Sequence, residues 1–337
     1  MIPRERLLAA LAGRETDRLP TQVTFTPLAA EQAAAWLGVA VGDLHSTLGN
    51  HILDAMVDPR DRAEGTTSFD LWGVGWDSTV NDGFRIDVHP LAELSALSRY
   101  RMPDPDDERF YTDIQRVVAE NGGRCAVFAD LGFTLWERYY LLRGFEQAME
   151  DLVANPSLVE DLLDQILEVM IGISRHLVGL EIDVGYSGDD FGSQRGLLFA
   201  PAMWRRLFKP RYEKLWGVFR SAGIPVCHHS CGDVRVIIGE MIETGLDLLC
   251  PVQTHAMPPQ ELADKWGSRL AFWGGICTQS VLPFGSPADV HRHIDLCRET
   301  LGRHSRYVIG PSHDLTSDVP KANFLAMLDG MEIEPPR

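Results

Sequence analysis

The sequence predicts an α/β fold, a single (β/α)8 TIM barrel with an N-terminal extension, over all 337 residues. Short apolar runs alternate with helix-like segments, which indicates parallel strands covered by helices. No glycine-rich dinucleotide fingerprint follows an early strand, so a barrel fits better than two doubly wound halves. No clear linker divides the chain. We therefore expect residues 1–337 to form one domain.

The strands and helices of this barrel are expected where the pattern changes along the chain. Six apolar runs predict strands, at residues 125–132, 181–190, 224–231, 246–253, 269–276 and 306–313. Helical patterns occupy residues 201–222, 233–244 and 287–302. Pro201 begins the first of these and Gly245 follows the second, as is typical of helix ends. The stretch "DLWGVGW" predicts an early hairpin or extended insertion at residues 70–76.

Composition excludes several classes of partner. The formal net charge is −17, from 31 basic and 48 acidic residues, and no run rich in lysine and arginine offsets it. Such a field repels nucleic-acid phosphates and anionic lipids, so we expect neither nucleic acid nor membrane as a partner. No stretch resembles a signal peptide or a membrane span, which predicts a cytoplasmic protein. Its six cysteines are then expected to be free thiols or metal ligands.

Polar side chains stand at the ends of the predicted strands. In a parallel barrel all strands end at one face, where residues from separate strands gather around a pocket. The polar strand ends are Asp189 and Asp190, His229 and Cys231, Gln253, Cys277, and His313. We expect these residues to converge on one site.

The stretch "VCHHSCGDV", residues 226–234, is the strongest candidate for a metal site. Residues two apart in a strand share a face, so His229 and Cys231 point the same way while His228 faces the helices. Zinc accepts imidazole and thiolate ligands, and a catalytic site uses three protein ligands and leaves one position open. We expect His313 to be the third ligand and Cys277 to be an alternative one. The competing interpretation is a core histidine beside a buried cysteine.

The remaining candidates are polar groups near the same strand ends. Asp189 and Asp190 are adjacent and point apart, so one is expected in the pocket while the other caps a helix; capping alone is the alternative. Gln253 is expected to orient substrate beside these carboxylates. Gln279 and Tyr186 are candidate pocket residues.

Three longer segments carry a family resemblance. They are "HHSCGDVRVIIGEMIETGLDLLCPVQ", "AFWGGICTQSVLPFG" and "YVIGPSHDLTSDVPKANFLAM". Together they resemble the uroporphyrinogen decarboxylase superfamily, which implies a single (β/α)8 barrel. True uroporphyrinogen decarboxylases carry an arginine-rich substrate motif that "RLPTQVTFTPLAAEQ" lacks. A porphyrinogen would then leave buried carboxylates unpaired, so the resemblance favours the zinc-dependent, cobalamin-linked methyltransferases of the superfamily.

The resemblance to these methyltransferases implies roles for particular residues. Their His-x-Cys ligand pair looks like His229 and Cys231, and His313 stands where their third ligand is usually a cysteine. Gln253 replaces an acidic residue of some members, and Cys277 replaces an aspartate. The resemblance implies Zn²⁺, a corrinoid on a partner protein, and methyl transfer involving a small methylated substrate or thiol. The alternatives are a metal-free decarboxylase or lyase acting on a non-porphyrin carboxylate, and a non-catalytic subunit of a methyltransferase complex.

Overall fold

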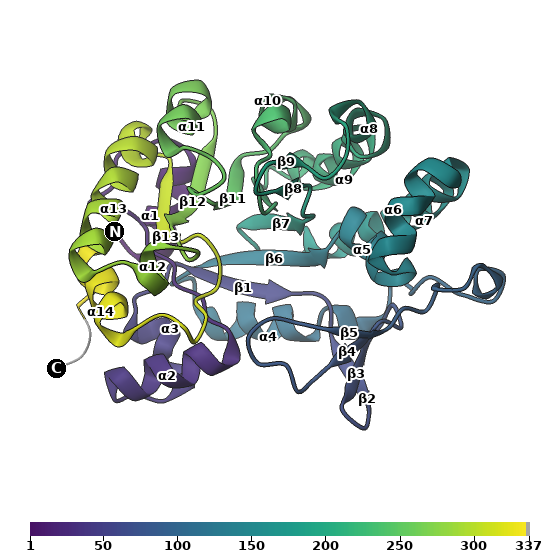
Figure 1. The fold of residues 1–337 in the computed structure, drawn as a ribbon, viewed down its shortest axis with the longest axis horizontal. Helices are drawn as coiled ribbons and strands as arrows, with labels where there is room; N and C mark the ends of the chain where they lie inside the picture. The colour runs from purple at the N-terminus through teal and green to yellow at the C-terminus, as the bar shows by residue number, and fades with distance from the viewer. Residues whose placement is uncertain (335–337) are drawn as a thin grey trace.

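A curled parallel sheet forms the centre of the molecule and helices surround it (Figure 1). The structure is a computed structural model that describes residues 1–334, apart from the side chain of Asp61. Among these residues the sheet has seven strands in the order β1-β6-β7-β10-β11-β12-β13. They are β1 (Ile52–Met56), β6 (Ala126–Phe133), β7 (Val184–Gly188), β10 (Val226–His229), β11 (Leu248–Val252), β12 (Ala271–Ile276) and β13 (Tyr307–Pro311). The predicted barrel fold is confirmed.

An extended segment, residues 20–26, closes the barrel between β13 and β1. On one side Ile309 N donates to Pro20 O at 2.9 Å, and Gln22 N donates to Ile309 O at 3.0 Å. On the other side a single backbone hydrogen bond, from His51 N to Thr21 O at 3.1 Å, is supplemented by the Gln22 side chain. Its Nε2 donates to Ile52 O at 3.2 Å, and its Oε1 accepts from Ile52 N at 3.0 Å. The Asn50 amide also bonds to the backbone N and O of Val23, so buried amide side chains complete the ring of hydrogen bonds.

The predicted elements agree with the structure except in two places. All six predicted strands are present, and α10 (Arg235–Thr244) and α13 (Pro287–Thr300) match their predicted helices. The helix predicted at 201–222 is two helices, α8 (Pro201–Leu207) and α9 (Lys209–Ser221). Pro210 causes this break because it has no amide hydrogen for the preceding turn. Strand β1 was not predicted, since Asp54 interrupts its apolar run.

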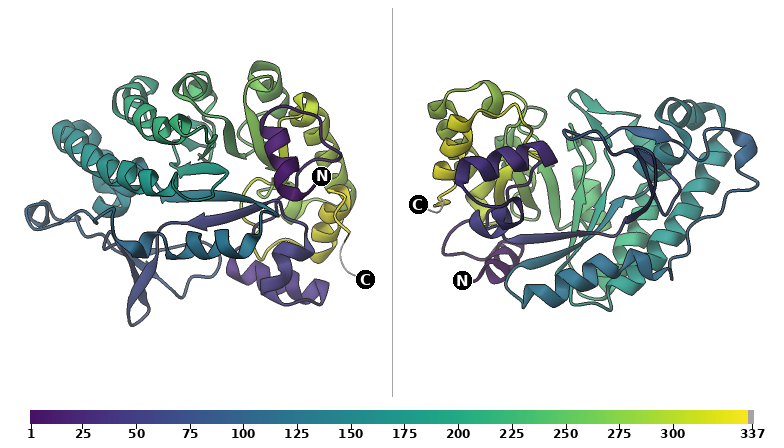
Figure 2. Two further views of the ribbon diagram at one scale, coloured as in Figure 1. Left: turned by 180° about the vertical axis from the view of Figure 1, so that it is seen from behind. Right: turned by 90° about the horizontal axis from the view of Figure 1, so that it is seen from below.

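The other helices lie outside the sheet, as the views in Figure 2 show. The α-helices are α1 (Pro3–Leu11), α2 (Pro27–Leu37), α3 (Leu44–Thr47), α4 (Thr112–Asn121), α5 (Trp136–Arg143), α6 (Phe145–Ala154), α7 (Pro156–Leu177), α11 (Pro259–Trp266), α12 (Val281–Phe284) and α14 (Lys321–Gly330). Short 3-10 helices occupy Val41–Asp43, Leu94–Ala96, Glu108–Phe110 and Leu301–His304. Within residues 1–334 no helix is long and apolar enough to cross a membrane.

A small antiparallel sheet covers one side of the barrel mouth. It contains β2 (Arg60–Glu64), β3 (Thr67–Asp70), β4 (Gly75–Asp77) and β5 (Ile86–Val88). Of the two alternatives predicted for residues 70–76, the structure shows the hairpin, formed by β3 and β4. Arg138 of α5 joins this sheet to the barrel. Its guanidinium donates to Asp70 and to Asp58, each at 2.8 Å, and its side chain is fully buried.

The barrel interior changes from apolar to polar along the strands. Leu7 and Leu11 of α1 close the amino end and pack with Ile52, Phe128 and other buried side chains. Two residues further along β1 and β6, on the same face, stand Asp54 and Asp130. The polar groups therefore lie at the carboxyl end of the strands, where barrel enzymes place their chemistry.

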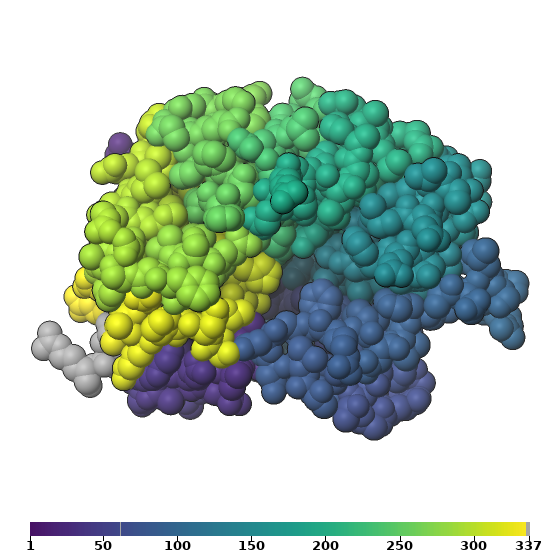
Figure 3. All heavy atoms as spheres, in the orientation of Figure 1, coloured from purple at the N-terminus to yellow at the C-terminus, as the bar shows by residue number. Residues whose placement is uncertain are grey.

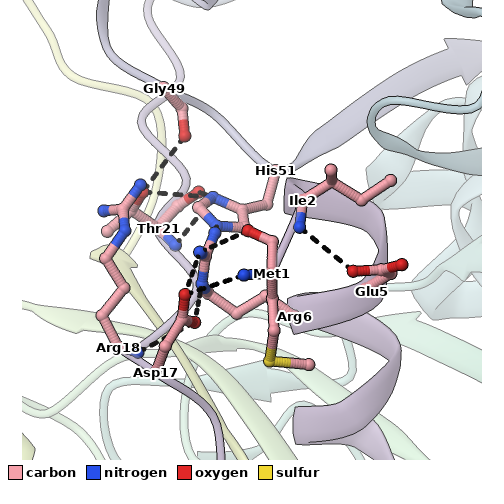
Figure 4. Close-up of polar contacts among 9 residues, drawn as sticks. All are labelled: Met1, Ile2, Glu5, Arg6, Asp17, Arg18, Thr21, Gly49 and His51. Carbon is pink, nitrogen blue, oxygen red and sulfur yellow. Dashed lines mark hydrogen bonds and ion pairs between the residues drawn. The ribbon is translucent and has the colours of Figure 1, made fainter.

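A polar network fastens α1 to the closing segment at the amino end (Figure 4). Arg6 donates to Asp17 at 2.6 Å through Nε and lies 2.9 Å from Nε2 of His51 through Nη1. Because arginine can only donate, Nε2 of His51 is the acceptor and its ring is neutral. Burial, with the charges of Arg6 and Arg18, lowers the pKa of His51 to about 4.

Candidate active site

A cavity of about 340 Å³ opens at the carboxyl end of the strands. Figure 3 shows this face hollowed near its centre, between the yellow segment that follows β13 and the blue segment of the small sheet. Side chains from β1, β6, β7, β10, β12 and the segment after β13 line the cavity. His229, His313, Asp190 and Tyr186 are among them. A volume of this size suits a small organic molecule.

The three predicted metal ligands lie together beside this cavity. One donor atom each from His229, Cys231 and His313 lies within 4.8 Å of the other two. Nε2 of His229 is 3.4 Å from Sγ of Cys231, and the rings of His229 and His313 are 5.6 Å apart at 88°. Neighbouring ligands of a tetrahedral zinc ion are about 3.4–3.8 Å apart, given bonds of about 2.0–2.3 Å. The donors therefore fit such an ion after a small movement.

Tyr186 orients the ring of His229. The Tyr186 hydroxyl donates to Sγ of Cys250 at 3.7 Å, and its oxygen is 3.3 Å from Nδ1 of His229. That oxygen accepts from Nδ1, which leaves the lone pair of Nε2 directed toward Cys231. Burial also lowers the pKa of His229, which favours the neutral, ligating form of its imidazole.

Asp190 and Gln253 hold the backbone around Cys231. Oδ1 of Asp190 accepts from Cys231 N at 2.7 Å, and Oε1 of Gln253 accepts from Gly232 N at 2.9 Å. Gly232 has a φ of +81°, and a Cβ there would meet backbone of Gly192 at 2.4 Å. The turn after β10 therefore requires glycine. Gln253 supports this turn from behind and does not line the cavity.

Burial makes the Cys231 thiol a weak acid. It raises the pKa of Cys231 well above its usual value, and the charge of Asp190 adds to this effect. The thiolate form needs a nearby positive charge, such as that of a bound metal ion.

The adjacent carboxylates Asp189 and Asp190 point to different sides of the strand end. Asp190 lines the cavity. Asp189 is fully buried and accepts from the backbone N–H groups of Leu135, Trp136 and Glu137 at 2.8–3.1 Å. It thereby caps α5, and the hydroxyl of Tyr212 also donates to it. Asp189 does not line the cavity.

Cys277 and Gln279 also lie outside the cavity among the residues described. The Cys277 side chain is buried, with Sγ 3.2 Å from the Ser280 hydroxyl, and Gln279 is exposed on the same turn. Neither belongs to the cluster of donor atoms around His229.

Several cavity residues were not predicted from the sequence. Asp54, Asp130, Glu137 and Trp273 all line the wall. A single acidic residue within an apolar strand, as in "AVFADLGF", was the signal for Asp130. The sequence carries no such signal for Glu137, because this residue lies in a helix whose direction relative to the cavity is determined only by the fold.

Comparisons with known proteins show the family. The model described as "Uroporphyrinogen decarboxylase (URO-D)" matches residues 2–332. The chain therefore belongs to the uroporphyrinogen decarboxylase family, as its motifs predicted, and this points to an enzyme of that superfamily. No curated protein matches it.

One solved structure shares the fold over nearly its whole length. A methyltransferase from Methanosarcina mazei is 18% identical, with a TM-score of 0.71 and 98% of each chain covered. A B12-independent methionine synthase from Shewanella sp. W3-18-1 is 8% identical, with a TM-score of 0.43 and 64% of each chain covered. A D-psicose 3-epimerase from Clostridium cellulolyticum H10 is 10% identical, with a TM-score of 0.44 and 85% and 89% of the two chains covered. At 18% identity the likeness to the methyltransferase concerns the fold alone.

Proposed function

We propose that the protein is a zinc-dependent methyltransferase that moves a methyl group between a small substrate and a corrinoid on a partner protein. The observation that carries this proposal is the meeting of His229, Cys231 and His313, whose donor atoms lie within 4.8 Å of one another beside the cavity. Two imidazoles and one thiolate are a donor set that zinc accepts, with a fourth position left for substrate.

The chain's own residues would prepare that fourth position. Tyr186 fixes the His229 ring, while Asp190 and Gln253 fix the turn that presents Cys231. The carboxylate of Asp190 also faces the cavity, where it would orient the substrate. When bound, zinc supplies Lewis-acid chemistry that lowers the pKa of a thiol or polarises a methylated heteroatom. We assign Asp189 to holding α5, because its oxygens are occupied by backbone donors.

The corrinoid is assigned to a partner because the cavity, at about 340 Å³, has room for a small substrate only. The cobalt would then approach the substrate from the mouth of the barrel. All six cysteines are free thiols, which suits a reducing compartment and supports a cytoplasmic location.

The metal-free decarboxylase is the weaker candidate. Among the described residues that line the cavity there is no lysine or arginine to pair with a substrate carboxylate. Burying an unpaired carboxylate beside the acidic residues of this wall is strongly unfavourable.

The test is methyl transfer from methylcobalamin to a panel of small thiols, followed by the change in the corrinoid absorption spectrum. Zinc-loaded protein is expected to accelerate transfer, and exhaustive chelation is expected to abolish it. Activity of the chelated protein toward carboxylates would support the lyase instead. Tight binding of a corrinoid protein without turnover would identify a non-catalytic subunit.

A further inference from the structure

The wall of the cavity is acidic and aromatic. Its acidic side chains are Asp54, Asp130, Glu137, Asp190 and Asp314. Its aromatic side chains are Phe84, Phe133, Tyr140, Tyr186 and Trp273. No lysine or arginine among residues 1–334 lines it. A cavity with this composition attracts positive charge and repels anions.

The acidic groups have more acceptor oxygens than the protein supplies donors for. No group among the described residues donates to the Asp54 carboxylate, which opens into the cavity from β1. Asp130 is 7% exposed, and only one of its oxygens accepts a hydrogen bond, from Gly132 N at 2.8 Å. Asp54 is exposed within the cavity and Asp130 also lines it, so their free oxygens are available to a donor group on a bound molecule.

These carboxyl groups also repel one another. Burial raises the pKa of Asp130 to about 7, and burial followed by the charges of Asp130 and Asp314 raises the pKa of Asp54 well above its usual value. A bound cation would relieve this repulsion.

The aromatic rings provide the second part of a cation site. Asp130 pairs with Tyr186 across neighbouring strands, and the Tyr186 ring lies 6.1 Å from that of Trp273. Rings of this kind attract organic ammonium ions through their π faces.

We propose that this cavity selects substrates that carry an ammonium group, held by Asp54, Asp130 and the aromatic wall near Trp273. This inference rests on the proposed function, because it names the chemical class of the substrate at the same site. The ammonium group would occupy the acidic and aromatic wall, and a second group of the same molecule would reach the donor cluster around His229.

The test measures binding to the metal-free full-length chain by calorimetry at about pH 8, where more of the Asp130 carboxyl is ionised. The probes are choline, its uncharged isostere with carbon in place of nitrogen, and methanesulfonate. Choline is expected to bind at least about tenfold more tightly than the isostere, and methanesulfonate is expected not to bind. Equal affinity for choline and isostere, or tighter binding of methanesulfonate, would overturn the proposal.

Charge-neutralising variants assign the effect to the wall. Asp54→Asn and Asp130→Asn are each expected to remove most of the preference for choline. Asp295→Asn, on the exposed side of α13, makes the same charge change away from the cavity and is expected to leave the preference intact. An unchanged preference in both cavity variants, with circular dichroism as for the unmodified chain, would show that other residues are responsible.

Repeating the titrations with zinc separates the two proposals. Selectivity for choline without zinc binding would contradict the proposed function and leave the cation site standing. Zinc binding without selectivity for choline would contradict the cation site and leave the proposed function standing.

Discussion

Nε2 of His229 lies 3.4 Å from Sγ of Cys231, although the strand that carries the histidine ends at His229 itself. Strand alternation puts both side chains on the inner face, and the turn after β10 keeps them there. Asp190 and Gln253, from two different strand ends, hold that turn through its backbone N–H groups. The arrangement of the two donors thus depends on three strand ends of the barrel.

The third ligand is expected to contribute less to zinc affinity than the first two. His313 is exposed, and its Nδ1 accepts from Asp314 N at 2.8 Å. Coordination through either ring nitrogen disrupts this hydrogen bond, because a neutral imidazole has only one lone-pair nitrogen. Competition with a chelating dye should therefore show a smaller loss of affinity for His313→Ala than for His229→Ala. A larger loss for His313→Ala would make His313 the principal ligand and contradict this account.

Gln253 is expected to act on the metal site without touching it. Removing its amide in Gln253→Ala leaves Gly232 N without an acceptor and loosens the turn that carries Cys231. Zinc affinity should fall about tenfold or more, as is usual when a group that orients a ligand is lost. The matched control is Gln165→Ala on α7, whose side chain bonds only to its own helix. Equal zinc affinity in both variants would argue against a positioning role.

The buried ion-pair cluster of Arg138 is expected to dominate the stability of the barrel mouth. Arg138→Met leaves the carboxylates of Asp58 and Asp70 buried without their common partner. The free energy of unfolding, from urea titration, should fall by about 3–5 kcal/mol. Arg116→Met, which breaks only exposed ion pairs on α4, should change it little. Similar small losses in both variants would show that the cluster is not a stabilising link.

Acidification is expected to weaken the amino end of the barrel through His51. Its folded pKa, about 4, is below the unfolded value of 6.5, so the folded state prefers the neutral ring. The neutral His51 ring contributes its full share of the free energy of unfolding above pH 6.5. This contribution is lost as the pH falls toward 4, by up to about 3 kcal/mol.

The measurement is the free energy of unfolding at several pH values between these limits. His51→Gln removes the titrating ring while keeping an acceptor for Arg6, so its stability should fall less steeply than that of the unmodified chain. The same slope in both proteins would mean that other groups cause the acid sensitivity.

Much of the fold could be predicted because strand and helix patterns alternate regularly after residue 124. The first part of the barrel could not be predicted. The closing segment contacts β1 partly through the side chain of Gln22, and the apolar pattern of β1 is interrupted by Asp54. Period-two spacing was enough to bring His229 and Cys231 together, and the parallel topology added His313. The separate roles of Asp189 and Asp190 depended on the β6–α5 loop, whose backbone N–H groups surround Asp189.

The metal content of the protein purified without added metal tests the proposed zinc centre most directly. Mass spectrometry of the native chain should find about one zinc ion per molecule, and His229→Ala and Cys231→Ser should each lose most of it. Cys297→Ser, a buried cysteine outside the donor cluster, should retain it. A native protein that holds no zinc and takes none up, or variants at His229 and Cys231 that keep all of it, would contradict the proposed centre.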